Sequence, residues 1–192
     1  MLMSEKMKIK VGFPFCVTAL MLLSGELRES FLCAFVISLI HETGHLVAML
    51  VMKICPRSIA FTPTGIKINC PTGIIPPRTE CIISASGPLM NVILMPVLYF
   101  FSSELPFYIN TGLLIINLLP FRSLDAGRFL YNLTVILKDE FYAEKIMNIT
   151  ETVVCICLVL LLICLLINRI VNPSFIALTV MLVVTTVTQL VK

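Results

Sequence analysis

Long apolar blocks constrain the fold of this chain more than any other feature of its sequence. Six such blocks cover residues 11–25, 31–52, 79–101, 107–137, 152–168 and 173–191. A helix needs about 20 apolar residues to cross the hydrocarbon core of a bilayer. Of the 192 residues, 58% are hydrophobic and 13% are charged, against about 25% charged in soluble domains. We therefore predict an all-α polytopic membrane protein with about six transmembrane helices.

The basic residues predict which side of the membrane the termini occupy. If the N-terminus is cytoplasmic, six spans return the C-terminus to the same side. Of the 14 Lys and Arg residues, only Arg28 and Arg169 then lie on the outer side, as expected when positive charge stays in the cytoplasm. The net charge of +3 is explained by this topology, and no nucleic-acid partner is expected.

Residues 57–78 interrupt the apolar pattern between the second and third blocks. Ile59, Phe61, Ile66 and Ile68 alternate with small or polar residues, and Pro and Gly mark turns between them. This alternation is typical of short strands joined in a hairpin. We predict a short membrane-associated β-hairpin here. A surface hairpin on the cytoplasmic side is the alternative, because backbone at membrane depth must be buried in protein or line a wet cavity.

The second block holds the only two histidines of the chain, within the sequence SLIHETGHLVAML. On a helix, His41, Glu42 and His45 lie within an arc of about 100°. This is the HExxH arrangement, in which the histidines bind zinc and the glutamate acts as general base. A chance cluster of hydrogen-bonded side chains is the alternative. Charged groups inside a span cost at least about 2.5–3.5 kcal/mol and are rare without a function, so we predict one zinc ion per chain.

A third zinc ligand must come from elsewhere, because catalytic zinc sites usually have three protein ligands. Residues 107–137 would form a straight helix of about 46 Å, too long for a core of about 30 Å. Pro120 breaks the helical pattern, and Asp125 is the only acidic residue of this block. We predict Asp125 as the third ligand. A helix cap, or an ion pair with Arg122 or Arg128, is the alternative role.

Two motifs resemble those of the site-2 protease family of intramembrane zinc metalloproteases. HETGH is followed by NLLPFRSLDAGR, and the family's second motif reads N-x-x-P-x-x-x-x-D-G. Asn117, Pro120 and Asp125 match its spacing, whereas Ala126 stands where the family usually has glycine. SGPLMN at residues 86–91 resembles the family's G-P-x-x-N segment. The short layout is similar to the bacterial and archaeal branch that includes the sporulation factor processing protease.

The resemblance covers about residues 30–140 and implies an intramembrane zinc endopeptidase. It implies cleavage of transmembrane or membrane-associated proteins, as in regulated intramembrane proteolysis, with Glu42 as the catalytic base. Substrate contacts are implied for Asn91, Asn117 and Gly65. The predicted hairpin would pair with an unwound substrate as an added strand.

We expect residues 1–192 to form one intramembrane protease domain, without a PDZ domain or a C-terminal regulatory domain. The expected location is a bacterial or archaeal cell membrane, with a membrane protein substrate and a possible regulatory membrane partner. Two alternatives stay open. One is a membrane-anchored HExxH protease of another family, whose third ligand would be Glu140, Glu144 or Glu151 in a short cytoplasmic loop. The other is a non-enzymatic zinc-binding bundle or transporter.

Overall fold

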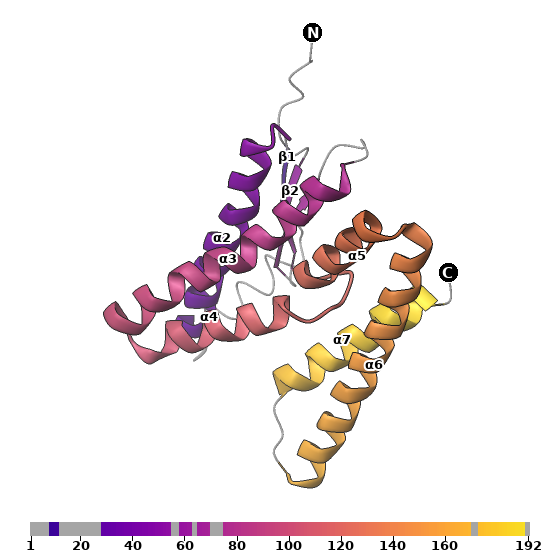
Figure 1. Ribbon diagram of the computed structural model, residues 1–192. Coiled ribbons are helices and arrows are strands. Elements are labelled where there is room, and N and C mark those ends of the chain that lie inside the picture. The colour runs from indigo at the N-terminus through magenta and orange to yellow at the C-terminus, as the bar shows by residue number, and fades with distance from the viewer. Residues whose placement is uncertain are drawn as a thin grey trace.

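The computed structural model describes residues 8–11, 28–54, 58–62, 65–69, 75–169 and 173–190. The elements in these ranges are β1 (Lys8–Val11), α2 (Arg28–Val51), β2 (Ser58–Thr62), β3 (Gly65–Asn69), α3 (Pro77–Phe101), α4 (Glu104–Asn117), α5 (Asp125–Leu137), α6 (Glu140–Ile167) and α7 (Pro173–Leu190). In Figure 1, α6 and α7 form an antiparallel pair beside the group that contains α2, α3 and α4. Helices dominate the fold, as predicted.

Three of the described helices are long and apolar enough to cross a membrane, namely α2, α3 and α6. The apolar part of α7, Phe175–Thr188, is shorter. Residues 12–25 of the first predicted span lie outside the described residues. The structure therefore supports the membrane character of the chain, and the count of six spans stays a prediction.

The long block at residues 107–137 is divided in two, which confirms the break predicted at Pro120. Helix α4 ends at Asn117, and α5 begins at Asp125. Between them the chain turns through residues 118–124, where Phe121 N donates to Leu119 O at 2.9 Å. Proline has no backbone N–H and cannot continue a helix ladder, so the local sequence accounts for the break.

The segment expected to be a cytoplasmic loop after α5 is helical, which corrects that prediction. Glu140, Glu144 and Glu151 all lie on α6, which begins 12 residues before the predicted span at residue 152. The N-cap is Asp139, whose side chain accepts a hydrogen bond from Tyr142 N. Such a cap satisfies a free N–H of the first turn, and the polar first turns of α6 continue without interruption into its apolar part.

A small sheet occupies the segment where the hairpin was predicted. Strands β2 and β3 pair antiparallel, with Ser58 opposite Asn69 and Thr62 opposite Gly65. Strand β1 pairs parallel with β2 and was not expected from the sequence. The order β1-β2-β3 leaves β3 at one edge of the described sheet. β3 also contacts α2, and the membrane association of the hairpin stays a prediction.

Helix α3 lies at the centre of the packing and contacts α2, α4 and α5, while α6 contacts α5 and α7. The contact between α2 and α3 is close at Gly44, where an added Cβ would lie 2.5 Å from Ser86 O and 2.6 Å from Met90 Cγ. Small residues allow helix backbones to approach closely in membrane proteins. This packing places the histidines of α2 beside α3 and the start of α5.

Candidate metal and catalytic site

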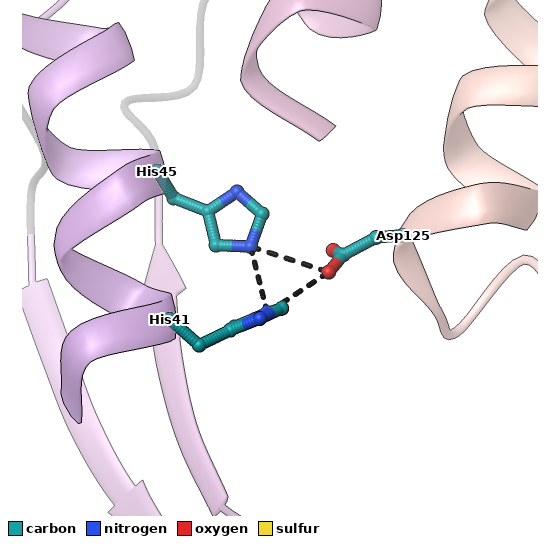
Figure 2. Close-up of side chains that lie close together, drawn as sticks. All are labelled: His41, His45 and Asp125. Atoms are coloured by element: carbon teal, nitrogen blue, oxygen red, sulfur yellow. Dashed lines mark hydrogen bonds and ion pairs between the residues drawn. The ribbon is translucent and has the colours of Figure 1, made fainter. Parts of the chain in front are cut away.

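The two histidines lie on the buried face of α2. His41 is 4% exposed and His45 is 6% exposed. They are four residues apart, so both rings project from the same side of the helix. Figure 2 shows the two rings turned toward Asp125, at the start of α5. The structure thus brings together three residues that the sequence predicts as ligands, from helices separated by about 80 positions.

The ligand atoms of this cluster converge on one point. Asp125 Oδ2 lies 3.0 Å from His41 Nε2 and 3.3 Å from His45 Nε2, and the two Nε2 atoms are 3.2 Å apart. Figure 2 shows these three contacts as a triangle. Zinc bonds of about 2.0–2.1 Å in tetrahedral geometry separate neighbouring ligand atoms by about 3.3–3.4 Å. The spacing of the three atoms is close to that requirement.

Hydrogen bonding of the His45 ring directs the lone pair of its Nε2 atom toward the point where the three ligand atoms converge. His45 Nδ1 is 2.7 Å from the carbonyl oxygen of Ile83, and a carbonyl can only accept. In the neutral ring the proton is therefore on Nδ1, and Nε2 presents its lone pair to Asp125. Asp125 Oδ2 is buried, and within the described part of the chain it has no hydrogen-bond donor besides these ring nitrogens. Two acceptors facing each other at this distance fit a shared cation, and zinc suits this set of two imidazoles and one carboxylate.

Helix α3 closes one side of the cluster at Gly87. An added Cβ there would lie 2.7 Å from His41 Nε2 and 2.6 Å from His45 Cε1, with His45 Nε2 closer still. Only glycine lets the backbone of α3 approach the ligand atoms in this way. From the sequence alone, Gly87 has a second interpretation as a flexible point in a helix. The closeness of Gly87 to the rings depends on the packing of α2 against α3.

Asp125 does not take either of the alternative roles considered from the sequence. The N-cap of α5 is Leu124, and Asp125 is the first residue inside the helix. Arg128 pairs with Glu80 on α3. Arg122 Nη1 lies 2.7 Å from Glu144 Oε2. Both arginines therefore have other acidic partners, and the Asp125 carboxylate is directed at the histidines.

Glu42 follows His41 directly and is partly buried. Its carboxylate is near enough to interact electrostatically with His41, His45 and Asp125. A general base must lie within reach of the water or substrate group whose proton it takes. The position of Glu42 beside the ligand cluster is compatible with that role, which stays a prediction.

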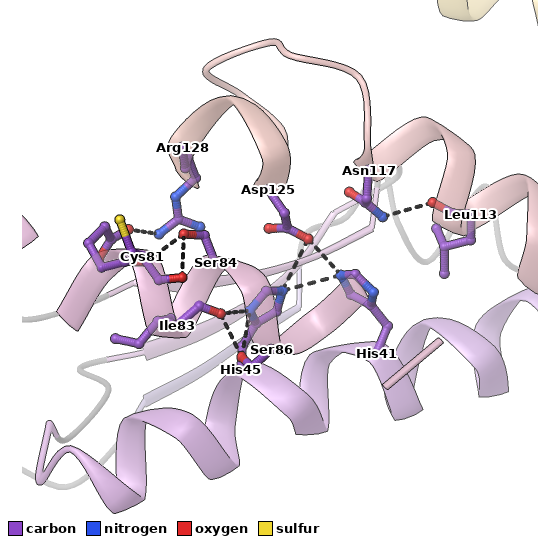
Figure 3. Close-up of polar contacts among 11 residues, drawn as sticks. His41, His45, Cys81, Ile83, Ser84, Ser86, Leu113, Asn117, Asp125 and Arg128 are labelled. Carbon is purple, nitrogen blue, oxygen red and sulfur yellow. Dashed lines mark hydrogen bonds and ion pairs between the residues drawn. The ribbon is translucent and has the colours of Figure 1, made fainter. Parts of the chain in front are cut away.

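The three residues predicted to contact substrate occupy different environments. Asn91 on α3 is fully buried, and neither polar atom of its side chain has a hydrogen-bond partner among the residues that the structure describes. Asn117 ends α4 and donates to Leu113 O within its own helix at 3.1 Å (Figure 3). Gly65 begins β3. Among the three, Asn91 has a side chain left free for another partner.

Comparisons with known proteins bear on the family resemblance indicated by the motifs. No protein family model matches the chain. Stage IV sporulation protein FB of Bacillus subtilis (strain 168) is 28% identical over 159 residues, which cover 77% of this chain and 54% of that protein. The chain thus spans about half the length of this curated relative. The site-2 protease from Methanocaldococcus jannaschii has a similar structure, with a TM-score of 0.66 and 19% identity, over 98% of this chain and 92% of that one. The chain therefore has the site-2 protease fold, and the family resemblance indicated by its motifs is confirmed.

Proposed function

We propose that this protein is an intramembrane zinc endopeptidase that cleaves transmembrane or membrane-associated proteins. The convergence of His41, His45 and Asp125 within a buried site is the observation that carries the proposal. Two of these residues come from a helix long and apolar enough to span a membrane. We place the protein in a bacterial or archaeal cell membrane with both termini in the cytoplasm, in keeping with the distribution of basic residues.

Each residue of the site has a distinct role in the proposed reaction. Zinc held by the two histidines and Asp125 would lower the pKa of its bound water to about 7 and polarise the scissile carbonyl. Glu42 accepts the proton of the attacking water, since its carboxylate adjoins the ligands without being one of them. The Ile83 carbonyl holds the ring of His45 in orientation through Nδ1. Gly87 keeps the backbone of α3 close enough to limit the space around the ligands.

Substrate binding is proposed to use β3, at one edge of the described sheet, and the side chain of Asn91. A substrate helix hides its carbonyls in hydrogen bonds, so a segment must unwind before cleavage. Strand β3 is an edge strand that contacts α2, and an extended peptide can add to such an edge through backbone hydrogen bonds. A strand beginning near Gly65 would lie beside the helix that carries the histidines. Asn91, buried without partners, offers a donor and an acceptor to the peptide.

The alternatives drawn from the sequence are less well supported. A protease with a distant glutamate as third ligand would need Glu140, Glu144 or Glu151 near the histidines. Instead, Glu144 and Glu151 contact Arg122, and Glu140 contacts Tyr131. A zinc-binding bundle without activity would share the ligands and lack a need for Glu42. Catalytic measurement therefore separates it from the protease.

The test is cleavage of single-span substrates by the purified chain in liposomes loaded with zinc. We expect cleavage of at least one member of a substrate panel, loss of cleavage on removal of zinc with a chelator, and recovery on adding zinc back. Glu42→Gln serves as the paired variant, because it differs by one atom at the proposed base. Stoichiometric zinc binding without cleavage of any substrate would instead support a non-enzymatic bundle. Cleavage that persists in both the chelated protein and the variant would contradict the proposed metal mechanism.

A further inference from the structure

A buried glutamate on α6 has no role in the reaction described above. Glu151 is 2% exposed, although it lies on one of the helices apolar enough to cross a membrane. Burial of a carboxylate is costly unless partners compensate for the lost water. A buried ionisable group in such a helix is by default a candidate for function, and its partners indicate what that function is.

The partners of Glu151 lie in the turn that joins α4 to α5. Its Oε1 accepts a hydrogen bond from the backbone N–H of Arg122 at 2.5 Å, and its Oε2 lies 3.9 Å from Nε of Arg122. The N–H of a turn buried in a membrane protein needs an internal partner, because no lipid group can accept its proton. Glu151 supplies that partner from the neighbouring helix.

The side chain of Arg122 is held on the same face of α6. Its Nη1 contacts Glu144 Oε2 at 2.7 Å, and its Nη2 donates to Asn148 Oδ1 at 2.6 Å and to the carbonyl oxygen of Glu144 at 3.2 Å. Glu144, Asn148 and Glu151 are spaced four and three residues apart, so they share one side of the helix. Phe121, the preceding residue, is buried against Cys155 of α6 and Leu182 of α7.

The loop at residues 118–124, held by Glu151, also packs against the first turn of α5. A Cβ added at Gly127 would lie 2.8 Å from Arg122 N and closer still to the carbonyl of Phe121. Gly127 is two residues after Asp125, and Arg122 is three residues before it. The backbone on both sides of Asp125 is therefore in contact, and a shift at Arg122 must move the start of α5.

We propose that Glu151 is a positioning residue for Asp125: through the backbone N–H of Arg122 it fixes the turn at residues 118–124 and so places the Asp125 carboxylate against His41 and His45. This inference rests on the proposed metal site. Metal sites depend on placement to within about 0.5 Å, and loss of an outer partner that orients a ligand costs about 10–100-fold in metal affinity. The reach of the Glu151 side chain is therefore expected to matter more than its charge.

The test compares zinc affinities of four variants of the full chain in detergent, measured by competition with a zinc indicator. Glu151→Gln keeps an acceptor oxygen at the same reach but removes the charge. Glu151→Asp keeps the charge but shortens the side chain by one methylene, and Glu151→Met keeps the length without an acceptor. We expect zinc to bind about 10-fold more weakly in the Asp and Met variants, and Gln to restore most of the affinity. Glu144→Gln is the matched control, since its side chain is 46% exposed and exposed ion pairs contribute little.

Affinities of the Asp and Met variants within about twofold of the unmodified chain would overturn the positioning role, because the expected loss is about 10-fold. Weakening in the Gln variant as large as that in the Asp variant would also overturn it, because an acceptor oxygen kept at the same reach would then have restored nothing. If Glu151→Met does not fold, the comparison of Asp with Gln decides the outcome. His41→Ala is titrated in parallel. An unmodified chain that binds zinc no better than His41→Ala would instead contradict the metal site itself.

Discussion

Nδ1 of His45 lies 2.7 Å from the carbonyl oxygen of Ile83 on the neighbouring helix α3. Ser86 Oγ donates to the same carbonyl at 2.6 Å and lies 3.5 Å from the same ring nitrogen (Figure 3). The hydrogen bond from His45 Nδ1 to the Ile83 carbonyl assigns the proton of the neutral ring to Nδ1 and leaves Nε2 available as a ligand. The packing of α2 on α3 therefore orients a ligand of the proposed metal site as well as bringing its residues together.

The first prediction concerns the histidines. Purified protein is expected to contain about one zinc per chain, as for a site with three protein ligands. His41→Ala and His45→Ala should each lose most of this zinc. Their zinc affinity should fall by more than the roughly 10–100-fold that loss of an outer partner costs, because each variant lacks a direct ligand. Elemental analysis after dialysis measures the metal content. Full retention of zinc in both variants would contradict the site.

Gly87 provides a steric test of the site geometry. Gly87→Ala places a methyl group 2.7 Å from His41 Nε2 and closer to His45 Nε2, so the rings must move and zinc binding should weaken by about 10-fold or more. Gly112→Ala is the matched control, because an added Cβ there meets nothing within 4 Å. That control should bind zinc normally and gain up to about 1 kcal/mol of stability from helix propensity. Equal zinc affinities in the two variants would show that α3 does not approach the ligands.

Asp125→Asn tests the third ligand. A neutral amide is a poorer ligand for zinc than a carboxylate, so we expect weaker zinc binding and loss of cleavage. Arg128→Ala removes a neighbouring charge whose partner is Glu80, and should leave the zinc content unchanged. Zinc content and cleavage are measured on the same preparations. Undiminished cleavage by Asp125→Asn with zinc still bound would refute the ligand assignment.

Glu42→Gln separates the base from the metal ligands. The variant should retain zinc and lose about 10²–10⁴-fold in the rate of cleavage, the usual contribution of a general base. Rates are measured in zinc-loaded liposomes, with metal content determined in parallel. A loss of zinc comparable to that of the histidine variants would assign Glu42 to the metal instead.

Asn91 is predicted to contribute to substrate binding at a cost in stability. Both polar atoms of its side chain are buried without partners, and each unsatisfied buried group costs about 1–3 kcal/mol. Asn91→Leu should therefore raise the unfolding temperature in detergent while raising the KM for substrate and leaving zinc affinity unchanged.

Asn110→Leu is the comparison variant for this prediction. Asn110 Nδ2 donates to the backbone oxygen of Asn91 at 3.0 Å, and the substitution would remove that bond, so the same gain in stability is not expected. An Asn91→Leu variant with unchanged KM would assign Asn91 a structural role.

The local sequence was sufficient to predict features that depend on a single helix or on a single interruption of the helical pattern. The spacing of His41, Glu42 and His45 follows from the geometry of a single helix, and Pro120 ends α4 by removing a backbone donor. Length and apolar composition identified α2 and α3 as helices of membrane-spanning size, which the structure confirms. The strands β2 and β3 lie where alternation and turn residues indicated a hairpin.

Tertiary structure alone decided which side chains meet and which backbone groups orient them. Nothing in the sequence showed that the Ile83 carbonyl orients His45, that Arg122 and Arg128 have partners other than Asp125, or that Glu151 supports the turn. The physical reason lies in the apolar composition. A soluble helix shows its buried face by its polar opposite face, whereas a helix in lipid is apolar all round and gives little sign of its neighbours. The contact between α2 and α3 is set by close packing at Gly44 and Gly87. The contact of the 118–124 turn with α6 depends on buried polar groups whose partners are distant in sequence.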